Sequence, residues 1–235
     1  MAEKSLFHLK QGKEFEIKEL FKDISRLTKE HFGEKTDGLD LLDVGCASGE
    51  LSYFMKKDTG TSGKIQGFDI SPTLIKNAAE RFGDEGMKFF IADAADFKLD
   101  TKFDVITMTS VLSYFDDPYP VLKNMLGHLK KNGLAIISGI FNEHNIEVRL
   151  KYKLESDNEW IDNSVINQFS MKGISNFLAD YGYQAEFMKQ IMPFDVKPKE
   201  NPIRSWTVNA DGVRRMTNGL QLLYDIQILK IIDKK

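Results

Sequence analysis

The sequence contains a single cysteine, Cys46, in 235 residues. No disulfide can form within the chain, and a reducing compartment such as the cytoplasm fits this composition. Long hydrophobic runs are also missing, because the longest one, 134–141, is far shorter than the roughly 20 apolar residues of a membrane-spanning helix. The first residues carry no apolar signal-peptide core. We therefore expect a cytoplasmic protein without a membrane partner.

An excess of basic residues is absent as well. Lys and Arg total 32 while Asp and Glu total 35, so the formal net charge at pH 7 is −3. General nucleic-acid binders usually carry a basic surplus, and nucleic acid is therefore not an expected partner. Hydrophobic residues make up 42% of the chain, which is enough for a sizeable core that needs no structural metal.

From residue 39 onward, strand-like and helix-like segments alternate. Strands are expected at 39–44, 64–69, 87–91, 103–108, 134–138, 184–190 and 222–232. Helices are expected at 50–57, 71–82, 118–130 and 171–181. Strands separated by helices are typical of βαβ units with right-handed crossovers. The pattern predicts an α/β fold with a doubly wound, largely parallel sheet.

Three segments depart from this rhythm. Residues 1–38 are polar and amphipathic, which predicts a helical N-terminal lid in front of one main domain, 39–235. Residues 141–169 and 191–217 have no clean period, and the second contains an expected turn at Asp211-Gly212. Binding residues gather on loops held by a rigid scaffold, so we expect these two insertions to recognise the substrate.

A glycine-containing loop, Leu-Leu-Asp-Val-Gly-Cys-Ala-Ser-Gly at 41–49, follows the first strand and precedes a helix. Gly45 and Gly49 allow a sharp turn and a close approach of a ligand at the carboxyl edge of the sheet. A dinucleotide site would have glycine two positions before Gly45, where this chain has Asp43. A carboxylate there repels pyrophosphate and suits a cationic ligand such as an amino-acid ammonium group. An NAD-linked oxidoreductase is therefore disfavoured.

The pattern Asp-x-Gly-x-x-x-Gly resembles motif I of the class I S-adenosylmethionine-dependent methyltransferases. Further family motifs follow in order over about 39–140, with an acid ending the second strand, Asp69, and the third, Asp93. The resemblance implies a methyltransferase with a Rossmann-like, seven-stranded sheet, helices on both faces, and S-adenosylmethionine as cofactor, released as S-adenosylhomocysteine. The cofactor-binding residues that it implies are Asp43, Gly45, Cys46, Ala47 and Gly49 at the amino-acid end, Asp69 and Ile70 at the ribose, Asp93 and Ala94 at the adenine, and Ser110 near the methyl group.

Segments 138–142, 169–170, 204–207 and 218–220 resemble small-molecule methyltransferases of bacterial surface-polysaccharide or sugar biosynthesis. This likeness implies a small, anionic acceptor, phosphorylated or nucleotide-linked. The insertion agrees with it, because residues 195–215 hold five basic and three acidic side chains. Arginine can bind phosphate or carboxylate through two parallel hydrogen bonds.

The choice of acceptor atom decides whether a base is needed. An alcohol or ammonium nucleophile must lose a proton, whereas a carboxylate or phosphate oxygen is already deprotonated. His144 follows the fifth strand and is the candidate base, with an exposed loop histidine as the equally open alternative. The expected substrate-contacting residues are Tyr114, Asn142, Arg149, Tyr152, Arg204 and Trp206. No cluster in the sequence calls for a metal.

Several alternatives stay open. The chain could bind the cofactor without transferring the methyl group, or it could methylate a protein. Methylation of adenine or glutamine is disfavoured, because the fourth strand leads into Thr-Ser-Val-Leu at 109–112 rather than the Asn/Asp-Pro-Pro-Tyr/Phe of those enzymes. The acceptor, the choice of O or N, and the oligomeric state, a homodimer included, are not determined by the sequence.

Overall fold

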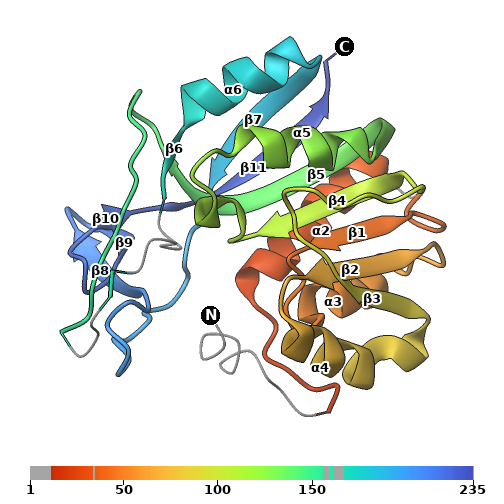
Figure 1. Ribbon diagram of the computed structural model, residues 1–235, viewed down its shortest axis with the longest axis horizontal. Helices are drawn as coiled ribbons and strands as arrows, with labels where there is room; N and C mark the ends of the chain where they lie inside the picture. The colour runs from red at the N-terminus through yellow and green to blue at the C-terminus, as the bar shows by residue number, and fades with distance from the viewer. Residues whose placement is uncertain (1–11, 34, 156–158, 161–166, 235) are drawn as a thin grey trace.

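The computed structural model describes residues 12–33, 35–155, 159–160 and 167–234. A central sheet with the strand order β3-β2-β1-β4-β5-β11-β7 crosses the molecule (Figure 1). Its strands are β1 Leu41–Val44, β2 Ile65–Asp69, β3 Met87–Ile91, β4 Phe103–Thr109, β5 Leu129–Asn142, β7 Tyr183–Lys189 and β11 Ile226–Asp233. The first five run parallel, while β11 is antiparallel to both β5 and β7. The predicted seven-stranded, doubly wound sheet is confirmed.

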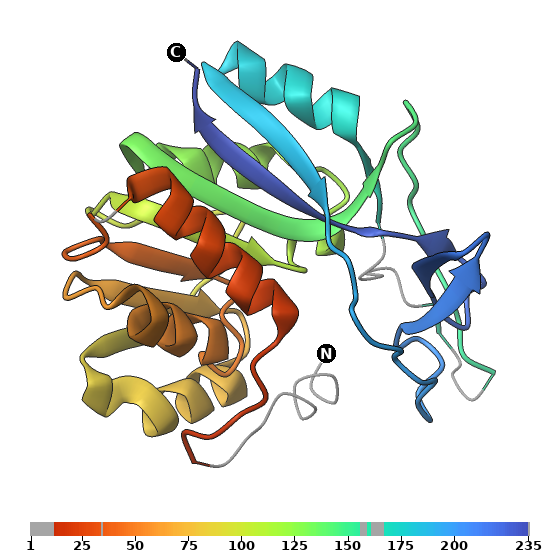
Figure 2. The same cartoon turned by 180° about the vertical axis from the view of Figure 1, so that it is seen from behind.

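Helices cover both faces of this sheet (Figures 1 and 2). One face carries α2 Glu19–Phe32, α3 Glu50–Thr59 and α4 Pro72–Phe82, and the other carries α5 Tyr119–Gly127 and α6 Met171–Asp180. Each face has its own apolar core. Ile24 and Met55 are buried on the first, and Leu122 and Leu178 on the second. Burial of these side chains contributes about 1.5–3 kcal/mol each.

The strand order reverses between β1 and β4, and this reversal marks the edge of the sheet at which a ligand is expected to bind. Connections from β1 and β4 leave in opposite directions at this point, and ligands of open α/β sheets bind in the crevice beyond the carboxyl ends of such strands. The helix after β2 begins as predicted. Ser71 Oγ accepts a hydrogen bond from the Leu74 amide at 3.4 Å, and Pro72 occupies the first helical position.

The helix expected at 118–130 is shorter, and the strand expected at 134–138 is longer. The helix α5 ends at Gly127, and β5 starts at Leu129, which pairs with Phe103. The reason is tertiary, because Leu129 is buried and the Lys130 ammonium bonds two strand-edge carboxylates. The Asn132-Gly133 pair, expected to stop a helix, instead lies in β5, where Asn132 has a left-handed φ of 59°.

The last expected strand, 222–232, was wrong at its start. Leu223–Tyr224 forms β10 in a separate three-stranded sheet with β8 Trp206–Ala210 and β9 Val213–Thr217, and β11 begins only at Ile226. The turn at Asp211-Gly212 is confirmed. Its φ values are 52° and 78°, which is the two-residue geometry that suits the twist of a hairpin.

The small sheet lies beyond the carboxyl ends of the parallel strands in Figure 1. The insertion at 141–169 leads into the short strand β6 Phe169–Ser170, which pairs with Phe141 and Asn142 at the end of β5. In the segment predicted as a lid, α2 packs on the sheet through buried side chains such as Phe21 and Leu27. Residues 1–11 lie outside the described part of the chain, and the role of residues 1–38 as a lid stays a prediction.

Candidate functional site

The loop Gly45–Gly49, which we call the glycine loop, joins β1 to α3. Gly45, Ala47 and Gly49 all have left-handed φ values, of 70°, 48° and 80°. A Cβ atom on Gly45 would lie 2.3 Å from a methyl carbon of Val111, and one on Gly49 would lie 2.9 Å from the ring of Phe89. Both glycines are therefore required by packing as well as by backbone conformation. The non-glycine Ala47 costs about 1–2 kcal/mol in this conformation, so other contacts must hold the loop.

Asp43 is the next-to-last residue of β1, two positions before this loop, and it is buried at 4% exposure. Its carboxylate accepts hydrogen bonds from the hydroxyl groups of Ser52 and Thr107, both at 2.8 Å. Burial raises the pKa of Asp43 to about 6, because these neutral donors only partly replace water. A buried carboxylate that has two hydroxyl partners and, within the described part of the chain, no cationic partner is a suitable acceptor for an ammonium group.

Sequence reasoning missed both hydroxyl partners. Thr107 lies directly opposite Asp43 in the β1–β4 register, and Ser52 faces it from the first turn of α3. A signal exists in the sequence, because Thr107 is the polar member of an otherwise apolar run in the fourth strand. That signal becomes useful only when the register of the two strands is known.

Asp69 connects the glycine loop to α4. One carboxylate oxygen accepts the Ala47 amide at 3.1 Å, and the other accepts the Ser71 amide at 2.9 Å. The neighbouring Ile70 is 57% exposed at the same edge. Asp93, two residues beyond the end of β3, accepts the Ala95 amide at 2.9 Å and precedes the buried Ala94. The two acids expected from the motif order thus lie at or just beyond the carboxyl ends of adjacent strands, and their roles toward ribose and adenine stay predictions.

The segment after β4 brings further expected residues to this edge. Ser110 has a left-handed φ of 56°, and its amide donates to the Ser138 carbonyl at 2.8 Å. Tyr114 follows in the short helix η3 Leu112–Tyr114. Partial burial raises the pKa of Tyr114, and the nearby Asp69 carboxylate and Tyr152 phenol raise it further. Asp69, Tyr114 and the buried Tyr152 are therefore brought together from three distant parts of the sequence.

The candidate base, His144, is not brought into this group. Its side chain is 75% exposed, and its ring nitrogen lies 4.0 Å from the carboxylate of Glu143. Asn142 accepts a hydrogen bond from the His144 amide at 3.0 Å. His144 thus lies at the surface, and its role as the base stays a prediction.

The basic residues of the insertions are partly neutralised. Arg149 bonds Glu147 at 3.1 Å and covers the Phe169 ring. Arg214 bonds Asp195 at 2.7 Å, and Arg215 bonds Asp225 at 3.2 Å. Arg204 is exposed, and Trp206, at the start of β8, is only partly buried. Two of the five basic side chains counted at 195–215 therefore form ion pairs between β9 and segments outside the small sheet.

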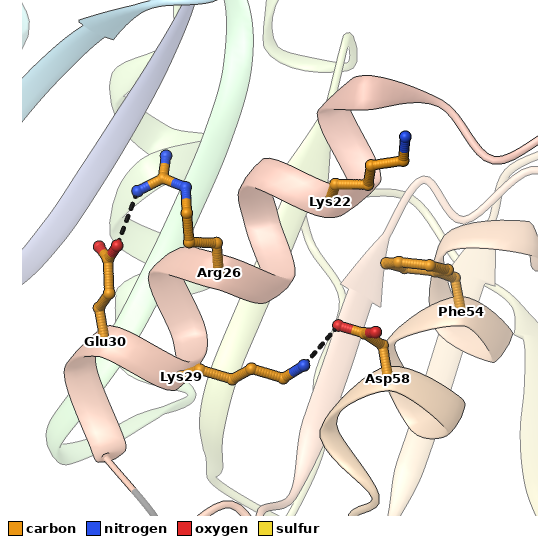
Figure 3. Close-up of a pocket in the computed structure, with 6 residues that line it drawn as sticks. All are labelled: Lys22, Arg26, Lys29, Glu30, Phe54 and Asp58. Atoms are coloured by element: carbon orange, nitrogen blue, oxygen red, sulfur yellow. Dashed lines mark hydrogen bonds and ion pairs between the residues drawn. The ribbon is translucent and has the colours of Figure 1, made fainter.

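A hollow of about 520 Å³ lies elsewhere, between α2 and α3 (Figure 3). Its lining residues are Lys22, Arg26, Lys29, Glu30, Phe54 and Asp58. Four of its charged side chains form two ion pairs, Arg26–Glu30 at 2.8 Å and Lys29–Asp58 at 2.7 Å. None of the expected site residues lines this hollow, and the carboxyl edge of the sheet remains the candidate site.

The described residues contain neither a cluster of metal ligands nor a membrane-spanning helix. No group of three or more His, Cys, Asp or Glu side chains in this part of the chain is arranged to hold a metal ion. None of the helices found there combines the length and the apolar character that a membrane crossing needs.

Comparison with known proteins agrees with this geometry. Residues 35–192 match a family described as "Methyltransferase domain". A malonyl-[acyl-carrier protein] O-methyltransferase of Acetivibrio thermocellus is 28% identical over 127 residues, which are 52% of this chain and 44% of the relative. A second enzyme of that name, from Ilyobacter polytropus, is 24% identical over 161 residues, 66% of this chain and 60% of the relative. The chain thus matches less than two thirds of the length of either relative.

Among solved structures, the magnesium protoporphyrin IX methyltransferase of Synechocystis PCC 6803, crystallised with S-adenosylhomocysteine, has a similar fold. The TM-score is 0.60 at 13% identity, over 99% of this chain and 94% of that chain. At this identity the likeness concerns the fold alone.

Proposed function

Because the chain belongs to the methyltransferase domain family, we propose that it transfers a methyl group from S-adenosylmethionine to an oxygen or nitrogen of a small, anionic molecule. The observation that carries this proposal is the glycine loop at the β1–β4 reversal. Its two glycines let Val111 and Phe89 pack closely against the loop, and Asp43 and Asp69 place carboxylates beside it. This arrangement offers carboxylates, rather than amide groups alone, to the ligand.

The residues present fit the cofactor by charge. Asp43 is a buried carboxylate whose described partners are neutral hydroxyls, so an ammonium group bound nearby would stabilise its ionised form. Asp69 and Asp93 can accept hydrogen bonds from hydroxyl and amine groups farther along the same edge. When bound, the sulfonium supplies an activated methyl group. The chain then has to hold the acceptor in line with it and exclude water.

The acceptor proposal rests on Tyr114, Tyr152 and the insertions. Tyr114 interacts electrostatically with both Asp69 and Tyr152, and its ring would form a wall of the methyl-transfer site. Arg149, Arg204, Asn142 and Trp206 lie on the insertions that extend from this edge, and we propose them as acceptor contacts. The exposure of His144 favours an acceptor oxygen that needs no base, such as a carboxylate or phosphate oxygen. For a neutral acceptor, His144 remains the proposed base.

The names of the two relatives support the same acceptor chemistry. Both are called O-methyltransferases of a malonyl group, which carries a free carboxylate. An acceptor in surface-polysaccharide biosynthesis is a more specific form of the proposal, and it rests on the resemblance of segments such as 204–207 alone. We further propose a cytoplasmic location.

The test is a screen of purified protein with radiolabelled S-adenosylmethionine and small acids, sugar phosphates and nucleotide sugars. Transfer of label to one of these classes would support the proposal. Binding of the cofactor with no transfer to any acceptor would favour a protein that only binds the cofactor, and labelling of an added protein would favour a protein methyltransferase.

A further inference from the structure

We propose that Arg81 is a positioning residue for the cofactor, because its guanidinium group locks the glycine loop and ties it to the segment before α2. This inference rests on the proposed use of S-adenosylmethionine. Arg81 lies on α4, one residue before the helix ends, and was not singled out by any sequence motif.

The Arg81 side chain is almost completely buried, at 3% exposure. One terminal nitrogen, Nη1, donates to the Ser48 carbonyl at 3.4 Å and to a Glu50 carboxylate oxygen at 3.2 Å. The Nε atom donates to the Gly12 carbonyl at 2.7 Å. The group also lies over the Phe82 ring, 4.6 Å from its centroid. One buried cation thus joins three segments that are far apart in the sequence.

The glycine loop needs such an anchor at its far end. Its three left-handed residues are held at the start by the Cys46 amide on the Phe68 carbonyl, and in the middle by the Ala47 amide on Asp69. Arg81 supplies the contact at the end, where Ser48 leads into the first turn of α3. A loop fixed at all three points is preorganised, and binding then costs less conformational entropy.

The segment before α2 is held against α3, α4 and the residues that follow α4. Lys13 bonds Asp84 and Glu85, both at 2.8 Å, and Phe15 packs edge-on against Tyr53 and Phe82. Figure 2 shows this segment lying between α4 and the start of α2. Through Arg81, the position of Gly12 is coupled to the position of Ser48.

Stability alone does not account for a charged group at this place. The second terminal nitrogen, Nη2, is buried and has no hydrogen-bond partner among the described residues. A buried ion pair of this kind is often replaced by apolar groups without loss of stability. We therefore expect Arg81 to matter more for the geometry of the glycine loop than for folding.

The experiment compares Arg81→Met, Arg81→Lys and the double variant Arg81→Met/Glu50→Gln with the wild-type chain. The double variant removes the ion pair without leaving an unpaired Glu50. Arg26→Met, which breaks an exposed pair on α2, is the matched control. Two quantities are measured on each protein: the Kd for S-adenosylhomocysteine by calorimetry, and the amide hydrogen exchange of residues 45–50.

We expect both Met variants to bind at least about tenfold more weakly and to exchange faster at 45–50, whereas Arg81→Lys recovers part of the affinity. The control should match the wild type in both measurements. If the double variant binds S-adenosylhomocysteine with the wild-type Kd and exchanges its amides at 45–50 at the wild-type rate, the inference is overturned. The double variant decides the question if Arg81→Met alone does not fold. If the wild-type chain itself does not bind S-adenosylhomocysteine, the proposed function fails, and the exchange measurement still shows whether Arg81 holds the loop.

Discussion

The Thr107 hydroxyl donates a 2.8 Å hydrogen bond to the Asp43 carboxylate across 64 positions of sequence. The two residues lie directly opposite each other on neighbouring parallel strands. With Ser52 on the other carboxylate oxygen, this contact keeps a buried acid ionisable beside the glycine loop. The arrangement links the strand register, the stability of the core and the proposed recognition of the cofactor.

Replacing Thr107 by Val tests the structural half of this relationship. The substitution keeps the shape of the side chain but leaves one oxygen of a buried carboxylate without its donor. We expect a loss of about 1–3 kcal/mol in the free energy of unfolding, measured by urea titration at pH 7. Thr101→Val, in the loop before β4, is the control and should change little. Equal stability of Thr107→Val and the wild type would show that the hydrogen bond contributes nothing.

Asp43→Asn tests the raised pKa. Burial raises the pKa of Asp43 from 3.8 to about 6 in the folded chain, so the folded state holds this proton more tightly than the unfolded state does. The resulting stability is present below pH 3.8 and is lost as the pH rises through about 6. At 1.36 kcal/mol for each pKa unit, the loss is about 3 kcal/mol.

The stability of Asp43→Asn relative to the wild type should therefore improve by about 2 kcal/mol between pH 4 and pH 7, because the unfolded carboxyl group is already partly ionised at pH 4. Urea titrations of both proteins at each pH measure this difference. The carboxylates with lowered pKa values, such as Asp58, are common to both proteins and cancel. A difference that stays constant over this pH range would contradict the raised pKa.

Gly45→Ala tests the packing of the glycine loop. The new Cβ atom would lie 2.3 Å from Val111, in addition to the strain of a φ of 70°. Gly60→Ala is a matched control, since Gly60 has a φ of 69° and no neighbour within 4 Å of its Cβ position. We expect the control to lose about 1–2 kcal/mol from strain alone and Gly45→Ala to lose a further 1–3 kcal/mol from overpacking.

Adding Val111→Ala to Gly45→Ala should recover part of that further loss, because it removes the methyl group that the new Cβ meets. Thermal unfolding of the two single variants and the double variant gives the coupling. If Gly45→Ala costs no more than Gly60→Ala, Val111 does not restrict the loop.

His144→Ala tests the acceptor chemistry. If the acceptor is a carboxylate or phosphate oxygen, turnover should stay within about threefold of the wild type, because no proton has to be removed. A loss of about 10²-fold or more, with an unchanged Kd for the cofactor, would assign His144 as the base and exclude an anionic acceptor oxygen. The measurement is the initial rate of methyl transfer with the acceptor found in the screen.

Local patterns in the sequence predicted most of the sheet and the first half of the site. The strand at Met87–Ile91 and the helix capped by Ser71 agree residue by residue with the structure, because their signals are short-range. The failure at Leu129–Lys130 has the opposite origin. Those residues look like the end of a helix, but pairing with Phe103 and two carboxylates across the sheet makes them a strand.

The site shows the same division. The glycines and acids at Gly45, Gly49, Asp69 and Asp93 follow each other in a motif, and the structure places them at one edge. Thr107 and Arg81 act across the fold, so the sequence alone offered no reason to choose them. The paired state of Arg214 and Arg215 likewise depends on Asp195 and Asp225, which charge counting cannot assign.

The most direct test of the central claim is a calorimetric titration of the purified chain with S-adenosylmethionine, S-adenosylhomocysteine and NAD in parallel. The account predicts that S-adenosylmethionine and S-adenosylhomocysteine bind with micromolar Kd and that NAD does not bind. Asp43→Asn should bind both ligands at least tenfold more weakly, because a neutral amide replaces the carboxylate expected to face the ammonium group. Binding of NAD alone would contradict the interpretation of the glycine loop, and with it the assignment of every cofactor-binding residue.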